Sequence, residues 1–414
     1  MQDSSNALSL RKFHLYGLCL TAAVLLVGLK GLDLGSVAAP LLLAAGIASG
    51  FLGIACYKES LFVRINAFLF FLFLGIAFLV GESQPTQAVR LASCLCFLLL
   101  IKYCFPVEGF SRRFFHFFLG GYVLSTTVGL MAVVGLWEPS DLFLPVYQTF
   151  RFAGLYNATI LGIVSAVLAI WLLDELVYPK MMRTHWTVKL LFLGYSLFIM
   201  VLTLTRSAWI GFAAGGLAYL VVNVASGNLA RIVSLVVATI LLVLVIFLGI
   251  LTRTGLYDLV RDRIVVDTLS GSSGAEAARA KFVYTRNALR LSQQNPLGLG
   301  LGMAGILGSE KEGLALGAHN TFAHVVTDLG WVTGATFILW NLSVVARLWK
   351  GCRRNDIKYQ VSFRMIFAGY MVLLFAGMFQ DLILYMPMWV IPAVGNILVK
   401  QDVRKIYRVR WAGV

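Results

Sequence analysis

Residues 155–176 read LYNATILGIVSAVLAIWLLDEL, a mostly apolar run that is long enough to cross the hydrocarbon core of a membrane as a helix. Eleven further runs of this kind occur, at 15–32, 37–56, 63–81, 88–105, 114–137, 187–205, 207–225, 230–251, 320–347, 361–380 and 382–400. The runs are continuous rather than alternating, which favours helices over a membrane-spanning barrel. The sequence therefore predicts an all-α polytopic membrane protein with about twelve transmembrane helices.

The composition agrees with this fold class. Of the 414 residues, 59% are hydrophobic and 13% are charged, and the mean hydropathy of +0.85 excludes a soluble protein. Arg11 and Lys12 precede the first run, and no small-residue cleavage site follows it. We therefore expect the first run to be an uncleaved span rather than a signal peptide.

The net charge of +15 mostly reflects the orientation of the chain in the membrane. With both termini in the cytoplasm, 22 of the 34 Lys and Arg residues fall on the cytoplasmic side, four at short outer loops and eight in one large outer segment. This distribution follows the positive-inside rule, so the basic excess faces the anionic lipid of the inner leaflet and a nucleic-acid partner is not expected. The expected domains are helices one to nine at 1–251, an extracytoplasmic segment at 252–318, and helices ten to twelve with a cytoplasmic tail at 319–414.

Several kinds of site are not expected. The six cysteines lie in the runs or on the cytoplasmic side, so no disulfide framework is predicted for the outer segment. His319 and His324 have no cysteine or Asp-x-Asp partner, so no metal site is expected. The GLGLG stretch at 298–302 does not have the spacing of a phosphate loop, and no hydrolase motif and no acidic pair with suitable spacing is present.

The segment 252–318 is the only outer connection that is large enough to fold as a subdomain. Residues 275–295 predict a helix, with Arg279, Arg286 and Arg290 on nearby faces. The proline that follows ends this helix, and an apolar glycine-rich loop comes next.

His319 and Asn320 stand where this outer segment meets the start of a long apolar run. The chain has five histidines, and the predicted topology places only His319 at the outer mouth of the bundle, where a neutral imidazole is the best available general base. Asn320 is expected to cap the following helix or to orient the imidazole. The alternative for His319 is a capping or interfacial residue, and His324 is expected to be a packing residue inside the run.

Two arginines and one carboxylate complete the candidate site. Arg206 stands in VLTLTRSAWIGF, at the turn between the seventh and eighth runs, and Arg151 stands in TFRFAGLYN before the sixth run. A guanidinium binds phosphate oxygens as a fork, although snorkelling at a helix end and anchoring at the interface are the alternatives. Asp381, at the outer end between the last two runs, is a candidate to orient an arginine or a histidine. Several outer arginines suit a polyanionic headgroup such as a pyrophosphate.

Three stretches carry a resemblance to a known family. His319-Asn320, nine further residues, and then Gly330-x-x-Thr333 resemble the His-[Asn/Ser/Gln]-x9-Gly-x-x-[Gly/Thr/Tyr] signature of bacterial O-antigen ligases. The TRSAWIGF stretch and Asn295-Pro-Leu-Gly-x-Gly300 are similar to stretches of the wider superfamily of O-antigen ligases, O-antigen polymerases and protein O-oligosaccharyltransferases. The span number and the large outer segment also match, so the resemblance covers most of the chain.

The resemblance implies a GT-C-like, metal-independent, inverting glycosyltransferase that uses no cofactor and acts at the periplasmic face of the bacterial inner membrane. It implies transfer of O-antigen polysaccharide from undecaprenyl diphosphate to lipid A–core oligosaccharide in lipopolysaccharide biosynthesis. In this reading His319 is the general base, and Arg206 and Arg286 hold the diphosphate leaving group. The other residues expected to bind substrate are Arg151, Arg279, Arg290, Asn320 and Asp381.

Two alternatives stay open at this point. An O-antigen polymerase or a protein O-oligosaccharyltransferase shares the fold, the donor and the arginines, and differs in its acceptor. A polyprenyl-glycan transporter would show internal repeats with paired broken spans, and such halves are not seen in the sequence.

Overall fold

The computed structural model describes residues 110–133, 147–148, 151–152, 158–178, 182, 184–203, 205–224, 233, 237, 272–303, 320–353, 357–382, 388 and 391. The predicted spans one to four lie outside the described residues, as do His319 and nearly all of spans nine and twelve. The backbone of Arg151 and Arg279 is described, but their side chains are not.

The described chain is almost entirely helical. Its elements are α5 (Phe110–Val133), β1 (Tyr147–Gln148), β2 (Arg151–Phe152), α6 (Ala158–Val177), α7 (Trp186–Leu202), α8 (Arg206–Asn223), α12 (Ser272–Gln294), α14 (Thr321–Cys352) and α15 (Ile357–Gly377). The two short strands pair antiparallel as a hairpin just before α6. Every long helix except α12 lies on one of the predicted apolar runs, and α12 lies on the helix predicted for the outer segment.

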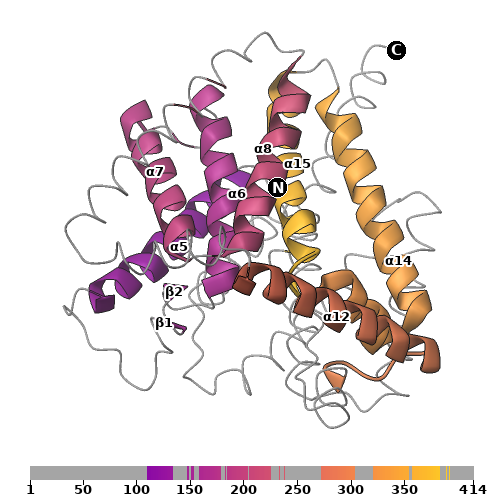
Figure 1. The fold of residues 1–414 in the computed structure, drawn as a ribbon. Coiled ribbons are helices and arrows are strands. Elements are labelled where there is room, and N and C mark those ends of the chain that lie inside the picture. Colours follow the sequence, from indigo (N-terminus) through magenta and orange to yellow (C-terminus); the bar gives the residue numbers. More distant parts are fainter. Residues whose placement is uncertain are drawn as a thin grey trace, which may run out of the picture.

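The helices form a bundle with one helix across its end. Figure 1 shows α6, α7, α8 and α15 side by side, α14 next to α15, and α12 crossing near the start of α14. Among the described helices, α6 and α14 are long and apolar enough to cross a membrane, and α7 and part of α15 are shorter apolar helices. The all-α prediction for a membrane protein is therefore consistent with the structure, while the twelve-helix count and the GT-C-like arrangement stay predictions.

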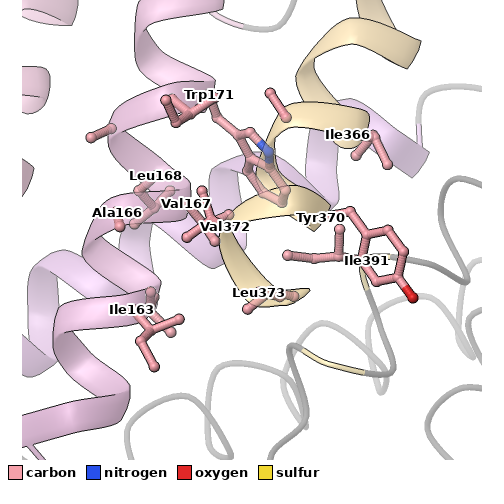
Figure 2. Close-up of a cluster of buried hydrophobic side chains, with 14 of the residues drawn as sticks. Ile163, Ala166, Val167, Leu168, Trp171, Ile366, Tyr370, Val372, Leu373 and Ile391 are labelled. Carbon is pink, nitrogen blue, oxygen red and sulfur yellow. The ribbon is translucent and has the colours of Figure 1, made fainter. Parts of the chain in front are cut away.

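The centre of the bundle is α6. Nearly all of its residues are buried, because α7, α8 and α15 pack around it. Figure 2 shows the apolar side chains of α6 and α15 facing one another, with Trp171 reaching toward α15. The indole Nε1 of Trp171 donates to Met365 O at 3.1 Å, which satisfies its polar atom inside this apolar contact.

Two glycines of α8 set how closely it approaches α15. A Cβ at Gly211 would lie 2.8 Å from Val372 O, and a Cβ at Gly215 would lie 2.8 Å from Ala368 O. Small residues four apart allow helices to approach closely in lipid, where packing rather than hydrophobic burial drives association. Because Gly211 also faces Ala376, the two helices run antiparallel and the start of α8 lies at the same end as the end of α15.

Large apolar side chains point outward from several helices. Trp186 and Leu191 on α7 are 58% and 70% exposed, Leu217 on α8 is 63% exposed, and Leu342 on α14 is 59% exposed. Surfaces of this kind are rare on soluble monomers and are typical of helices that face lipid.

A buried polar group lies where α6 and α8 end and α15 begins. We call Asp174, Tyr178, Tyr219, Asn223 and Arg364 the Arg364 cluster. Tyr219 OH donates to Asp174 Oδ1 at 2.8 Å, and Arg364 donates to Asn223 Oδ1 at 2.8 Å and to Tyr178 OH at 3.1 Å. These side-chain contacts join the three helices at the end of the bundle away from the start of α8.

Candidate functional site

The start of α14 is capped by Asn320. Its side-chain oxygen accepts from Phe322 N at 2.9 Å and from Ala323 N at 3.1 Å, so the predicted cap is confirmed. Its side-chain nitrogen donates to Met378 O at 3.0 Å, in the turn that follows α15. The residue after His319 is therefore held by two separate segments.

Thr321 strengthens the contact with the same turn. Its hydroxyl donates to Gln380 O at 2.8 Å and accepts from Leu382 N at 2.9 Å. A Cβ at Gly377 would lie 3.1 Å from this hydroxyl, so the end of α15 also approaches Thr321 closely. Together these contacts fix the turn after α15 on the first turn of α14.

His324 lies between two carboxylates, one turn into α14. Its Nδ1 is 2.5 Å from Asp381 Oδ2, and its Nε2 is 2.5 Å from Asp328 Oδ2. Ionised carboxylate oxygens only accept, so each contact needs a proton between nitrogen and oxygen. Each ring nitrogen faces a different carboxylate, so the three groups do not converge on one point as metal ligands do. We call His324, Asp328 and Asp381 the His324 bridge.

The bridge corrects one expectation and agrees with another. The sequence predicts a packing role for His324; the ring is buried, but both of its nitrogens make polar contacts, because the fold brings Asp381 against it. The expectation that Asp381 contacts an arginine or a histidine is met by this same ring. Asp328 and Asp381 were not recognisable as an acidic pair, since 52 residues separate them in the chain.

Asp328 connects the bridge to the glycine-rich loop that follows α12. Its carboxylate is fully buried and its Oδ2 also accepts from Gly302 N at 2.5 Å. A carboxylate in such surroundings is stable only with hydrogen-bond donors or opposite charge around it. The imidazole and the loop amide supply these donors.

The same loop seats on a break in α14. Gly330 has φ 87° and ψ 166°, so α14 consists of two helical parts that meet there. Trp331 N, just after the break, donates to Pro296 O at 3.0 Å instead of to a carbonyl of its own helix. Trp331 Nε1 donates to Ser292 O at 3.1 Å, near the end of α12.

The loop also satisfies carbonyl groups on the other side of the break. Leu299 N donates to Thr327 O at 3.1 Å, and Gly300 N donates to Asp328 O at 2.9 Å. A backbone group left unpaired at membrane depth costs several kcal/mol, so irregular backbone persists there only where protein or water satisfies it. The break in α14 and the loop therefore require each other.

Two glycines make this seating possible. Gly298 has φ 99°, and a Cβ there would lie 2.5 Å from Asp328 O. At Gly330 a Cβ would lie 2.6 Å from the carbonyl carbon of Leu297. Both positions combine a left-handed backbone with direct backbone contact, which only glycine tolerates. The Asn295-Pro-Leu-Gly-x-Gly300 stretch and the Gly330 end of the His319 motif thus pack against each other through Gly298 and Gly330.

We call the ranges 296–302, 320–331 and 378–382 the α14 junction. It joins the loop after α12, the start of α14 and the turn after α15. Two of its motifs are recognisable separately in the sequence, whereas the break at Gly330 and the bridge around His324 are not. The periodicity of the apolar run continues through the break, so it gave no sign of it.

Arg206 is the first residue of α8, and its side chain is exposed. The preceding turn is anchored on α6, because Thr205 Oγ1 donates to Ala158 O at 3.3 Å. A Cβ at Gly162 of α6 would lie 2.5 Å from Thr203 Oγ1, so the turn also packs tightly. Since α8 and α15 are antiparallel, Arg206 lies at the same end of the bundle as the α14 junction.

Two buried donors near Arg206 have no hydrogen-bond partner in the part of the chain that the structure describes. They are Ser207 Oγ and Trp209 Nε1, both in the first turn of α8. Buried donors in native proteins almost always have a partner, so a hydrogen-bond acceptor is expected for each of these two groups. Arg206 itself stands at the positive end of the α8 dipole, where its charge adds to that of the helix.

Arg286 and Arg290 of α12 lie on the side away from α14. Ala288 of α12 packs against Ala323 of α14, and both are buried. Arg286 and Arg290 stand two residues before and after Ala288, and both side chains are exposed. Two residues correspond to about 200° around a helix, so these arginines point away from the contact with α14. The structure places α12 at the candidate site but does not turn Arg286 or Arg290 toward the start of α14.

A family model described as O-antigen ligase matches residues 191–338, a range that starts in α7 and ends in α14 and so includes Arg206, α12 and the glycine-rich loop. No curated protein matches the chain.

Proposed function

We propose that this chain, whose residues 191–338 match a family model described as O-antigen ligase, is a member of the O-antigen ligase and polymerase family and is itself an O-antigen ligase. In this proposal it spans the bacterial inner membrane many times, with both termini in the cytoplasm and the active site at the periplasmic face. It transfers O-antigen polysaccharide from undecaprenyl diphosphate to lipid A–core oligosaccharide during lipopolysaccharide biosynthesis. The observation that supports it best is the gathering of Arg206, α12 and the α14 junction at one end of the bundle.

The acceptor side of the reaction is assigned to the start of α14. His319 removes the proton from the acceptor sugar hydroxyl, and the oxygen attacks the anomeric carbon of the donor with inversion. Asn320, which follows His319 in the chain, is fixed by the helix cap and by its contact with Met378 O. A fixed backbone at this point suits a base that has to meet one hydroxyl at hydrogen-bond distance.

The leaving-group side is assigned to the start of α8. As the bond between the anomeric carbon and the phosphate oxygen breaks, its electron pair goes to the diphosphate, and Arg206 stabilises the added negative charge. The helix dipole and the Ser207 and Trp209 donors add to the positive potential there. The guanidinium group takes over the charge stabilisation that a divalent metal supplies in other glycosyltransferases.

Arg286 and Arg290 are assigned to the approach of the carrier lipid. Their face of α12 carries Phe282 one turn before Arg286, and Phe282 is 71% exposed. Arg279, which also belongs to α12, is assigned to the same approach. A face with an exposed aromatic and arginines fits a lipid diphosphate that arrives from the membrane surface, with Arg151 as a further contact from the hairpin before α6.

The test is a transfer assay with the purified full-length chain in lipid nanodiscs. Carrier-linked glycan is supplied with or without lipid A–core, and the products are separated by size. We expect transfer only when lipid A–core is present. Lengthening of the carrier-linked glycan alone would contradict the ligase assignment and make the chain a polymerase.

A second arm of the assay tests the residues. We expect His319→Ala to abolish transfer with donor binding retained, and Arg206→Ala to weaken donor binding. A folded His319→Ala protein that transfers at the wild-type rate would remove the general base from the proposal.

A further inference from the structure

We propose that His324 is a positioning residue for the transfer reaction, and that it sets the place of His319 through the turn after α15. This inference rests on the proposed function, because it assigns a task to a residue of the same site. It starts from the His324 bridge, which touches all three segments of the α14 junction.

The bridge joins segments that are far apart in sequence. His324 and Asp328 belong to α14, Asp381 belongs to the turn after α15, and Gly302 N, which Asp328 binds, belongs to the glycine-rich loop. Removing the imidazole leaves two carboxylates facing each other without the donor between them. The turn then loses its contact with His324, and Asp328, which binds the loop amide of Gly302, loses a neighbouring donor.

His324 is not suited to be the general base itself. A base needs a ring nitrogen with a lone pair that faces the substrate hydroxyl. Both nitrogens of His324 face carboxylate oxygens at 2.5 Å, and the residue is only 8% exposed. Its geometry fits a bridge that holds other groups.

The turn after α15 links the His324 bridge to the start of α14. Asp381 is bound by His324, and Met378 O in the same turn accepts from Asn320, the neighbour of His319. Displacement of this turn is therefore expected to displace Asn320, the cap of α14 that adjoins His319 in the chain. Misplacement of a reacting group by about 1 Å can lower a rate by about 100-fold.

The test uses the full chain in nanodiscs and two variants with one control. His324→Gln removes one of the two bridging contacts. The double variant His324→Gln with Asp381→Asn replaces the lost ion pair by a neutral amide pair. Tyr370→Phe is the control, because it deletes the Tyr370–Asn341 hydrogen bond between the same two helices, α15 and α14, outside the junction.

Transfer to lipid A–core is measured as kcat and KM across pH, and amide hydrogen exchange is followed in parallel. For His324→Gln we expect kcat to fall by about 10- to 100-fold with a KM for lipid A–core within about two-fold, because the base is displaced and the acceptor still binds. The amides of 299–302 and 378–382 should exchange faster. The kcat of the double variant should be at least about five-fold higher than that of His324→Gln. Tyr370→Phe should keep the wild-type kcat.

Three results would overturn the proposal. The first is a wild-type kcat in His324→Gln. The second is a fall in kcat with unchanged exchange in both segments, which would mean that His324 acts directly. The third is disappearance of the low-pH limb of kcat/KM in His324→Gln, which would make His324 the base. If the wild type only lengthens carrier-linked glycan, the ligase assignment fails, and the same comparison on that reaction decides the role of His324.

Discussion

The Arg364 cluster and the α14 junction lie near the two ends of α15, about 20 Å apart along its axis, and they are built from different parts. In the Arg364 cluster, side chains of α6, α8 and α15 contact one another, and Tyr178 stands just after α6. In the α14 junction, side chains and backbone of a loop and a turn are tied to a helix that is itself broken. Both contain a buried charged side chain in an apolar protein, Arg364 in the cluster and Asp328 in the junction.

The difference indicates different tasks. Contacts between regular helices stabilise a bundle. The positions of the side chains in such a contact are already determined by the helix backbone. The backbone of a loop or a turn is not held by regular helical hydrogen bonds. The tertiary contacts of the α14 junction therefore determine the positions of the neighbouring residues. We therefore expect changes in the Arg364 cluster to lower stability alone, and changes in the α14 junction to lower activity.

Among changes within the two regions, the largest effect is expected for Gly330→Ala. The new Cβ would meet Leu297 backbone at 2.6 Å in a left-handed conformation, so the glycine-rich loop cannot seat. Transfer should fall by about 100-fold or more, and the free energy of unfolding by about 2–4 kcal/mol. Both are measured on the same preparation, by the glycan assay and by thermal unfolding in nanodiscs.

Gly216→Ala in α8 is the matched control, since the nearest atom to its Cβ, Ile170 Cδ1, is 4.0 Å away. It should leave transfer unchanged and raise the free energy of unfolding by about 0.5–1 kcal/mol. Wild-type transfer by a folded Gly330→Ala protein would show that the junction does not position the reaction.

The next effect is on stability alone. Arg364→Met deletes the donor to buried Asn223 and to half-buried Tyr178. The free energy of unfolding should fall by about 2–3 kcal/mol, because these are hydrogen bonds to a charged group. The kcat of the folded fraction should stay within about two-fold of wild type. A large fall in kcat without loss of stability would remove the distinction between the two regions.

The smallest of the three effects is expected for Asn320→Ala. It removes the cap of α14, which is worth about 1 kcal/mol of stability, together with the contact to Met378 O. Transfer should fall by about ten-fold, since the start of α14 loses one contact with the turn after α15 while the His324 bridge remains. An activity loss equal to that of Gly330→Ala would mean that the cap, rather than the seated loop, controls the site.

The bundle itself could be predicted from the sequence, and so could Asn320 as a cap. Long apolar runs and a cap residue before a helix are local signals, and α6, α8 and α14 begin within a few residues of the predicted positions. The exposed position of Arg206 at a helix start follows from its place between two runs. Local patterns were sufficient for these features because lipid leaves the backbone few alternatives.

The break at Gly330 and the role of His324 could not be predicted. Each depends on a contact across the fold: the loop at Gly298 seats on the break, and Asp381 reaches His324 from the turn after α15. A histidine inside an apolar run looks like a packing residue until its partners are known. The orientation of Arg286 away from α14 likewise follows from which face of α12 carries Ala288.

The central claim is that transfer takes place at the α14 junction, with His319 as the base. The most direct measurement is single-turnover transfer of carrier-linked glycan to lipid A–core by His319→Ala, with hydrogen exchange of 296–303 measured on the same sample. The account predicts at least about a 1,000-fold loss of rate with donor binding and loop protection unchanged. Transfer at the wild-type rate by this folded variant would contradict it.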